Sequence, residues 1–214
     1  MSSTPDCPGG LESGCQCCLR AAELVKAERA RIIALANGGG DTINAIKTAH
    51  DFGIGRDGKQ ALVGLAINLN DTHALGLEQA QGLMLTEAFY WDLNDKTRAW
   101  SKRWGAKMGG MVPGLLHAGN YCAATHWLKA VKAAGTTDAD LVAAKMKELP
   151  VNDFYNANVK VREDGRVMHQ MYLWEVKAQK ESKSKYDYCK QVAVIPPEDA
   201  WRPLADGNCP LVKV

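Results

Sequence analysis

From residue 31 onward, apolar runs and turn residues follow one another in the order strand, helix, strand. Residues 31–36 (RIIALA) form a short apolar run of the kind that becomes a buried strand. A glycine-rich turn follows, and then residues 43–52 place apolar side chains at helical spacing until Gly53, which is suited to a left-handed cap. A second apolar run covers residues 60–67. This order is typical of a parallel sheet with crossover helices.

The same criteria predict the rest of the chain. We expect a third strand at 82–88, a hairpin of 159–162 with 171–176 around an Asp-Gly turn, a last strand at 191–195 and an irregular tail. The predicted fold class is therefore α/β, a Rossmann-like parallel sheet flanked by helices. The expected further helices are 21–30, 74–81, 97–108, 119–134 and 139–149, the last capped by Asp138.

The first 20 residues differ from the rest, since they are rich in Cys, Gly, Ser and Pro and have no period. We expect a disordered leader at 1–20 and a folded domain at 21–214. Four of the seven cysteines crowd the leader, and the odd, uneven count does not fit a disulfide framework. Cys15-Gln16-Cys17-Cys18 lacks a second Cys or His pair at a useful spacing, so no metal site is predicted.

The charge pattern excludes some partners. The 26 basic and 24 acidic residues are spread along the chain and leave a net charge of +2. No basic run marks a nucleic-acid surface, and no apolar run approaches the roughly 20 residues that span a bilayer. The N-terminus also lacks the basic and apolar regions of a secretory signal, which taken literally predicts a cytoplasmic chain.

Candidate chemistry centres on the turn Gly38-Gly39-Gly40-Asp41-Thr42. It follows a strand and opens a helix, where free backbone N–H groups and the helix dipole favour an anion. The pattern lacks the third glycine of a dinucleotide fingerprint and the G-K-[ST] of a P-loop. Two interpretations stay open: the turn holds a carboxylate-like ligand group, or its glycines only shape the turn.

Nothing in the sequence predicts catalysis. The five histidines form no metal-binding pair, and the G-x-S-x-G elbow of serine hydrolases is absent. His73 is interpreted as a residue at a helix start. Trp100 and Trp104, at i and i+4, are predicted to be a packing stripe. We therefore predict no catalytic residues, no metal and no cofactor.

Four segments, in order along the chain, carry a common signal. The first contains the glycine turn, and the others contain the end of the third strand, the Lys147-Glu148-Leu149-Pro150 junction and the Asp-Gly turn. The segments are 34–47, 73–92, 146–154 and 162–169. Together they resemble the periplasmic solute-binding proteins of branched-chain amino acid type ABC transporters.

The resemblance implies the second lobe of a type I periplasmic binding fold, and only the C-terminal half of it. Such proteins have two α/β lobes joined by three crossovers that close on a ligand. By this resemblance the chain is a truncated, periplasmic, non-enzymatic binding protein whose partners are a small solute and ABC permease subunits. It also implies that the helices between 119 and 149 pack on the first lobe. A cytoplasmic ligand-sensing protein of the same fold is the alternative.

Ligand contacts in the family come from turns at the carboxyl ends of the strands. Here these turns correspond to Gly39, Asp41 and Thr42, to Ala66–Asn68 and to Phe89–Tyr90. Amino-acid binders of the family place a carboxylate on the second turn, where this chain has none closer than Asp71. An aromatic or aliphatic carboxylate, or an amide, is therefore as plausible a solute as an amino acid. The predicted ligand-binding residues are Gly39, Asp41, Thr42, Ala66, Asn68 and Tyr90.

Overall fold

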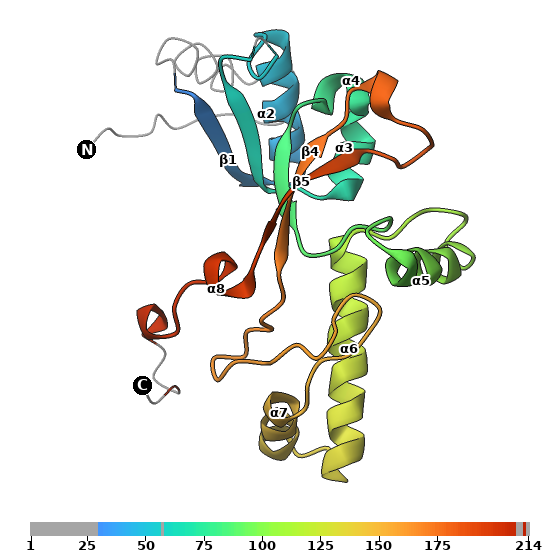
Figure 1. The fold of residues 1–214 in the computed structure, drawn as a ribbon, viewed down its shortest axis with the longest axis vertical. Coiled ribbons are helices and arrows are strands. Elements are labelled where there is room, and N and C mark those ends of the chain that lie inside the picture. The colour runs from blue at the N-terminus through green and yellow to red at the C-terminus, as the bar shows by residue number, and fades with distance from the viewer. Residues whose placement is uncertain (1–29, 57, 209–211, 213–214) are drawn as a thin grey trace, which may run out of the picture. The chain divides into compact units, whose positions relative to one another are not determined.

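The computed structural model describes residues 30–56, 58–208 and 212. It divides into two compact units, Met1–Thr86 with Trp174–Lys190, and Glu87–Leu173 with Gln191–Val214 (Figure 1). The chain therefore passes between the units three times. The predicted leader and the predicted helix 21–30, apart from Ala30, lie outside the described residues. That residues 21–214 act as one ligand-binding domain stays a prediction.

The strands form one five-stranded sheet in the order β1-β2-β3-β4-β5. The first three strands are parallel, with Val63 of β2 paired both to Ala34 of β1 and to Met84 of β3. These pairings confirm the parallel α/β sheet expected from the apolar runs. The expectation that the first run is buried is wrong, since the residues of β1 are exposed or half-buried and Ile32 is 68% exposed. The strands are β1 (Ile32–Gly38), β2 (Ala61–Ala66), β3 (Met84–Glu87), β4 (Met171–Val176) and β5 (Cys189–Ile195).

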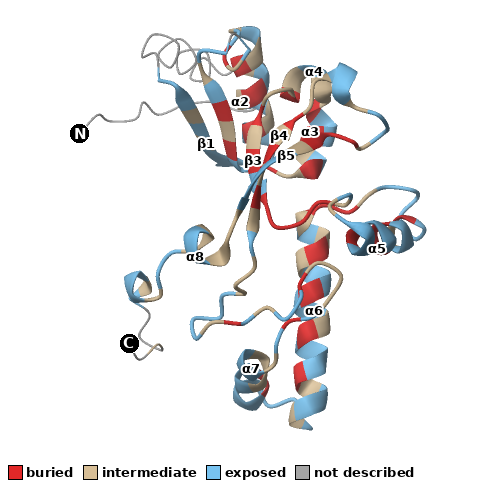
Figure 2. Cartoon of the chain, viewed as in Figure 1, coloured by how far each residue is buried: buried red, intermediate tan, exposed pale blue. Residues whose placement is uncertain are grey.

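Helix α2 (Gly40–Asp51) connects β1 to β2 and buries Ile46 and Ala49 (Figure 2). It starts three residues before the predicted start. Gly53 follows it with φ +73°, as expected for a residue that ends a helix.

The single helix predicted at 74–81 is wrong. The structure has two helices, α3 (Leu69–Leu75) and α4 (Leu77–Ala80), separated by Gly76 at φ +75°. Asn68 caps α3, so His73 lies in the last turn of that helix and not at its start. The glycine breaks the helical path, because its positive φ is incompatible with a continuing right-handed helix.

The three predicted helices of the second unit are present, although α5 starts two residues and α6 four residues before the predicted starts. Asn94 caps α5 through bonds from the N–H groups of Lys96 and Thr97 at 3.0 and 3.1 Å. Asp138 caps α7 through the N–H of Leu141, as predicted. The helices are α5 (Asp95–Gly105), α6 (Leu115–Ala134), α7 (Ala139–Glu148) and the short α8 (Pro197–Ala200), the last of which lies in the tail expected to be irregular.

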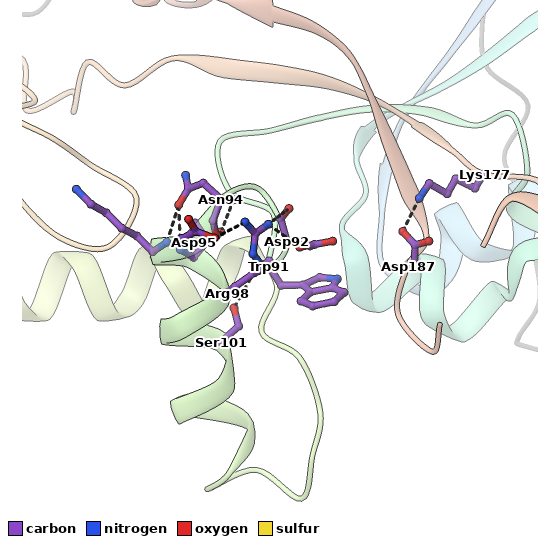
Figure 3. A network of polar contacts seen from close by, with 10 residues as sticks. Trp91, Asp92, Asn94, Asp95, Arg98, Ser101, Lys177 and Asp187 are labelled. Atoms are coloured by element: carbon purple, nitrogen blue, oxygen red, sulfur yellow. Dashed lines mark hydrogen bonds and ion pairs between the residues drawn. The ribbon is translucent and has the colours of Figure 1, made fainter. Parts of the chain in front are cut away.

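A polar network surrounds the start of α5 (Figure 3). The Arg98 guanidinium binds the Asp92 carboxylate at 2.9 Å and the Asp95 carboxylate at 2.6 Å. Both carboxylates raise the pKa of Arg98, Asp95 more than Asp92. Because both ion pairs are exposed to solvent, they contribute little to the free energy of unfolding. We infer that their role is to hold the first turn of α5 in place.

The core of the second unit is aromatic. Phe89 is fully buried, and its ring meets those of Trp100 and Phe154 edge-on at 5.8 and 5.7 Å. Trp100 stacks on Phe154 with centroids 3.9 Å apart and planes 3° apart. Trp104 packs against the same cluster, which confirms the predicted packing stripe. Such ring pairs stabilise a core beyond the area they bury.

The predicted hairpin pairs with a different partner. The Asp-Gly turn is present, with Gly165 at φ +85° and the Arg162 N–H bonded to Arg166 O at 2.8 Å. Val161, however, bridges Val167, whereas β4 lies between β3 and β5 in the sheet. Pairing of the predicted strand with residues 171–176 is therefore wrong.

No helix among the described residues combines the length and apolarity that crossing a membrane requires.

Gly64 and Gly119 provide a test of the packing. A Cβ at Gly64 would lie 2.3 Å from Cγ2 of the buried Ile67, whereas a Cβ at Gly119 meets nothing within 4 Å. Gly64→Ala should lower the free energy of unfolding by about 1–3 kcal/mol through overpacking. Gly119→Ala, inside α6, should raise it by about 0.5–1 kcal/mol. Urea unfolding measures both changes; equal effects of the two substitutions would contradict this packing.

Cys122 provides a second test. Burial first, and then the neighbouring Asp153, raise the pKa of its thiol to about 12. At pH 8 the thiolate fraction is then about 1 in 10⁴, against about a quarter for a free thiol. Iodoacetamide should therefore alkylate Cys122 at least about a thousandfold more slowly in native protein than in urea, as followed by peptide mass spectrometry. Native and unfolded rates within tenfold of each other would refute the burial.

Candidate ligand-binding site

Two of the three predicted turns lie side by side in the first unit. Parallel β1 and β2 end at the same edge of the sheet, and their register pairs Gly38 with Ala66. A Cβ at Gly38 would lie 3.9 Å from that of Ala66. The turn after β1, with Gly39, Asp41 and Thr42, therefore adjoins the turn after β2.

The turn after β1 exposes the N-terminus of α2. Gly39 is the N-cap, with φ +61° and ψ −136°, and no side chain caps this helix. A Cβ at Gly39 would have open space around it, but the positive φ favours glycine. Asp41 is exposed in the first turn. The N–H groups of this turn are thus available to an anion, as the helix dipole favours.

Thr42 adds a polar group at the third position of the same helix. The residue is 1% exposed, and its Oγ1 has no hydrogen-bond partner among the described residues. A buried hydroxyl without a partner costs free energy. The Thr42 hydroxyl is therefore unused among the described residues, and that it contacts a ligand stays a prediction.

The turn after β2 is organised by a capping box. Asn68 Oδ1 accepts from the Asn70 N–H at 2.9 Å, and Asp71 Oδ2 accepts from the Asn68 N–H at 3.0 Å. The nearest acid therefore engages one oxygen in the cap of α3. Ala66 is exposed. What this turn presents beside the α2 N-terminus is a small side chain and an amide.

The third predicted turn belongs to the second unit. Tyr90 follows β3, is 4% exposed and lies with its ring 6.2 Å from that of Trp91. Its neighbour Phe89 is a core residue. The described geometry of the first unit thus brings together Gly39, Asp41, Thr42, Ala66 and Asn68, whereas a ligand contact by Tyr90 stays a prediction.

The arrangement favours recognition of a small anionic or amide group. Uncapped N–H donors, a hydroxyl and an amide can bind and orient such a group by hydrogen bonds. No group of three or more His, Cys, Asp or Glu in the described part of the chain could hold a metal ion.

Sequence reasoning missed a second hollow surface, which lies wholly within the second unit. A groove of about 410 Å³ lies between α5, α6 and residues 152–154. The spacing of the lining residues along the sequence could have indicated the groove. Lys96, Trp100 and Arg103 lie on one face of α5. Tyr121 and Lys129 lie on one face of α6.

Comparison with known proteins identifies the family. A family profile described as periplasmic binding protein matches residues 20–183. A periplasmic binding protein of Burkholderia mallei is 45% identical, covering 90% of this chain and 50% of its own, with a TM-score of 0.81. No curated protein matched.

Two further solved structures agree in fold. A branched-chain amino acid ABC transporter periplasmic ligand-binding protein of Burkholderia xenovorans is 36% identical, with a TM-score of 0.79, covering 90% of this chain and 51% of its own. An amino acid ABC transporter substrate-binding protein of Pseudomonas fluorescens is 20% identical, with a TM-score of 0.71, covering 87% and 49%. The chain spans about half the length of these proteins. It belongs to the periplasmic binding protein family, in the branched-chain amino acid type fold.

Proposed function

We propose that the chain supplies one wall of the ligand cleft of an ABC uptake transporter's solute-binding component. The solute is a branched-chain amino acid or a similar small carboxylate or amide. The observation that carries this proposal is the register of Gly38 with Ala66, which sets the uncapped N-terminus of α2 beside the Asn68 turn. The name of the Burkholderia xenovorans relative supports the transport class.

The ligand carboxylate or amide carbonyl binds at the α2 N-terminus. There it accepts hydrogen bonds from backbone N–H groups at Gly40 and Asp41 and from the Thr42 hydroxyl, and the helix dipole stabilises its charge. Gly39 keeps the approach open because it carries no side chain. The rest of the ligand lies over Ala66 and toward Asn68, with Tyr90 as a further proposed contact.

The proposed role is binding without catalysis. The groups that the described part of the chain brings to this edge are backbone N–H donors, a hydroxyl and an amide, which suit recognition. By family, the protein acts in the periplasm and delivers its solute to permease subunits. One wall covers only part of a ligand, so the chain alone should bind weakly, with a Kd of about 1 mM or above.

Thr42→Val tests the first turn. The two side chains have nearly the same shape, and the Thr42 hydroxyl has no hydrogen-bond partner among the described residues, so stability should hold. Binding of L-leucine or benzoate to the ¹⁵N-labelled chain should weaken about fivefold to tenfold, as followed by amide shifts.

The matched control is Thr48→Val on the same helix. The Thr48 hydroxyl bonds Asn44 O within α2 and lies outside the first turn. This variant should bind as the original chain does. Unchanged binding by Thr42→Val, or an equal loss in both variants, would contradict the placement of the ligand.

Asn68→Asp tests the second turn and reports the ligand class. Aspartate caps helices as well as asparagine does, so α3 should persist. The added charge should weaken benzoate binding and strengthen L-leucine binding if the leucine ammonium faces residue 68, each by about threefold to tenfold. Weakened binding of both solutes would place a carboxylate there instead. Unchanged affinity for both would remove Asn68 from the site.

A further inference from the structure

The groove of the second unit is built from residues that the cleft does not use. It measures about 410 Å³, within the range of sites for small molecules. On α5, Lys96, Trp100 and Arg103 line it, at spacings of four and three residues. On α6, Tyr121 and Lys129 line it eight residues apart, so both face the same side of that helix.

The apolar part of the groove is a preassembled aromatic surface. Trp100 is 5% exposed and stacks on Phe154, so both rings are held in place. The Tyr121 ring meets both of them at steep angles, with centroids 5.4 and 5.7 Å away, and remains 41% exposed. Rings fixed in this way offer edges and faces to a planar guest at little entropic cost.

Three of the four charged side chains that line the groove are cations without an ion-pair partner in the described part of the chain. No carboxylate among the described residues lies within ion-pair distance of Lys96, Arg103 or Lys129. The Lys129 ammonium is anchored to a backbone carbonyl, Asn152 O, at 2.7 Å, which fixes the cation without cancelling its charge.

The acid that lines the groove is already engaged. One oxygen of Asp153 accepts from the N–H groups of Tyr155 and Asn156 at 2.9 and 2.8 Å. The other oxygen accepts from Asn156 Nδ2 at 2.9 Å. These bonds direct the Asp153 carboxylate into the chain. The lining still carries three positive charges against one negative charge, so it favours an anionic guest.

We infer that this groove is a second binding site, for a planar aromatic carboxylate of one or two rings. The ring system lies against Tyr121 and the Trp100–Phe154 stack, and the carboxylate pairs with Arg103 and Lys129. Both features are needed: cations alone select any anion, and rings alone select any apolar solute. The groove and the Gly39–Asn68 turns share no residue, because the groove is lined only by residues of the second unit and those turns belong to the first.

The test is an amide titration of the full ¹⁵N-labelled chain with 2-naphthoate, and with octanoate as an apolar acid of equal charge. We expect 2-naphthoate to shift amides of α5, α6 and residues 152–154, and to bind at least tenfold more tightly than octanoate. Equal binding of the two acids, or no shift at these amides up to 10 mM 2-naphthoate, would overturn the inference.

Charge variants with matched controls complete the test. Arg103→Gln and Lys129→Gln should each weaken 2-naphthoate binding about threefold to tenfold. Lys102→Gln and Lys132→Gln remove a charge from the same two helices at positions that do not line the groove, and should change binding less than twofold. An equal loss of affinity in the control variants would mean that only the net charge of the protein matters, and it would overturn the proposed site.

Two further variants separate this site from the cleft and test its rings. Tyr121→Leu, at an exposed ring, should reduce the preference for 2-naphthoate over octanoate; an unchanged preference would contradict aromatic recognition. Thr42→Val should leave the α5 and α6 shifts intact even though it weakens binding in the cleft, so that the two proposals fail separately.

Discussion

The parallel register of β1 with β2 is the constraint on which the first unit depends. Pairing Gly38 with Ala66 makes both strands end at one edge, and the elements that follow must start there. Helix α2 starts without a side-chain cap, whereas α3 starts with a complete one from Asn68 and Asp71. At this edge the N-terminus of α3 is capped by side chains, whereas the N-terminus of α2 is not. The free N–H groups of α2 are therefore where an anionic group would be bound most favourably.

The second unit has a different basis, an aromatic cluster around Phe89, Trp100 and Phe154. These rings hold α5 against α6 and the 152–154 segment, and the same packing leaves a groove rimmed by Lys96, Arg103 and Lys129. One set of contacts thus produces both the core and a charged hollow beside it. Trp100 illustrates this double role, since it is nearly buried and also lines the groove.

Sequence patterns predicted the elements that are determined by interactions between residues close together in the chain. The β1-α2-β2 unit and helices α5, α6 and α7 followed from apolar spacing and from caps such as Asp138. The start of α3 was missed, although Asn68-x-x-Asp71 is a visible capping signal, and the partner of 159–162 was missed because strand pairing across distant segments leaves no local pattern. Five of the six predicted site residues lie at one edge because parallel strands end together. The groove was not predicted, because it forms only where faces of two helices come together in space.

The central claim is that the α2 N-terminus and the Asn68 turn bind one ligand group together. Intermolecular nuclear Overhauser effects between bound benzoate and the ¹⁵N-labelled full chain test it most directly. The account predicts contacts from the ring protons to the amides of Gly40 and Asp41 and to the Asn68 side chain. Contacts confined to other residues, with none at this edge of the sheet, would contradict it.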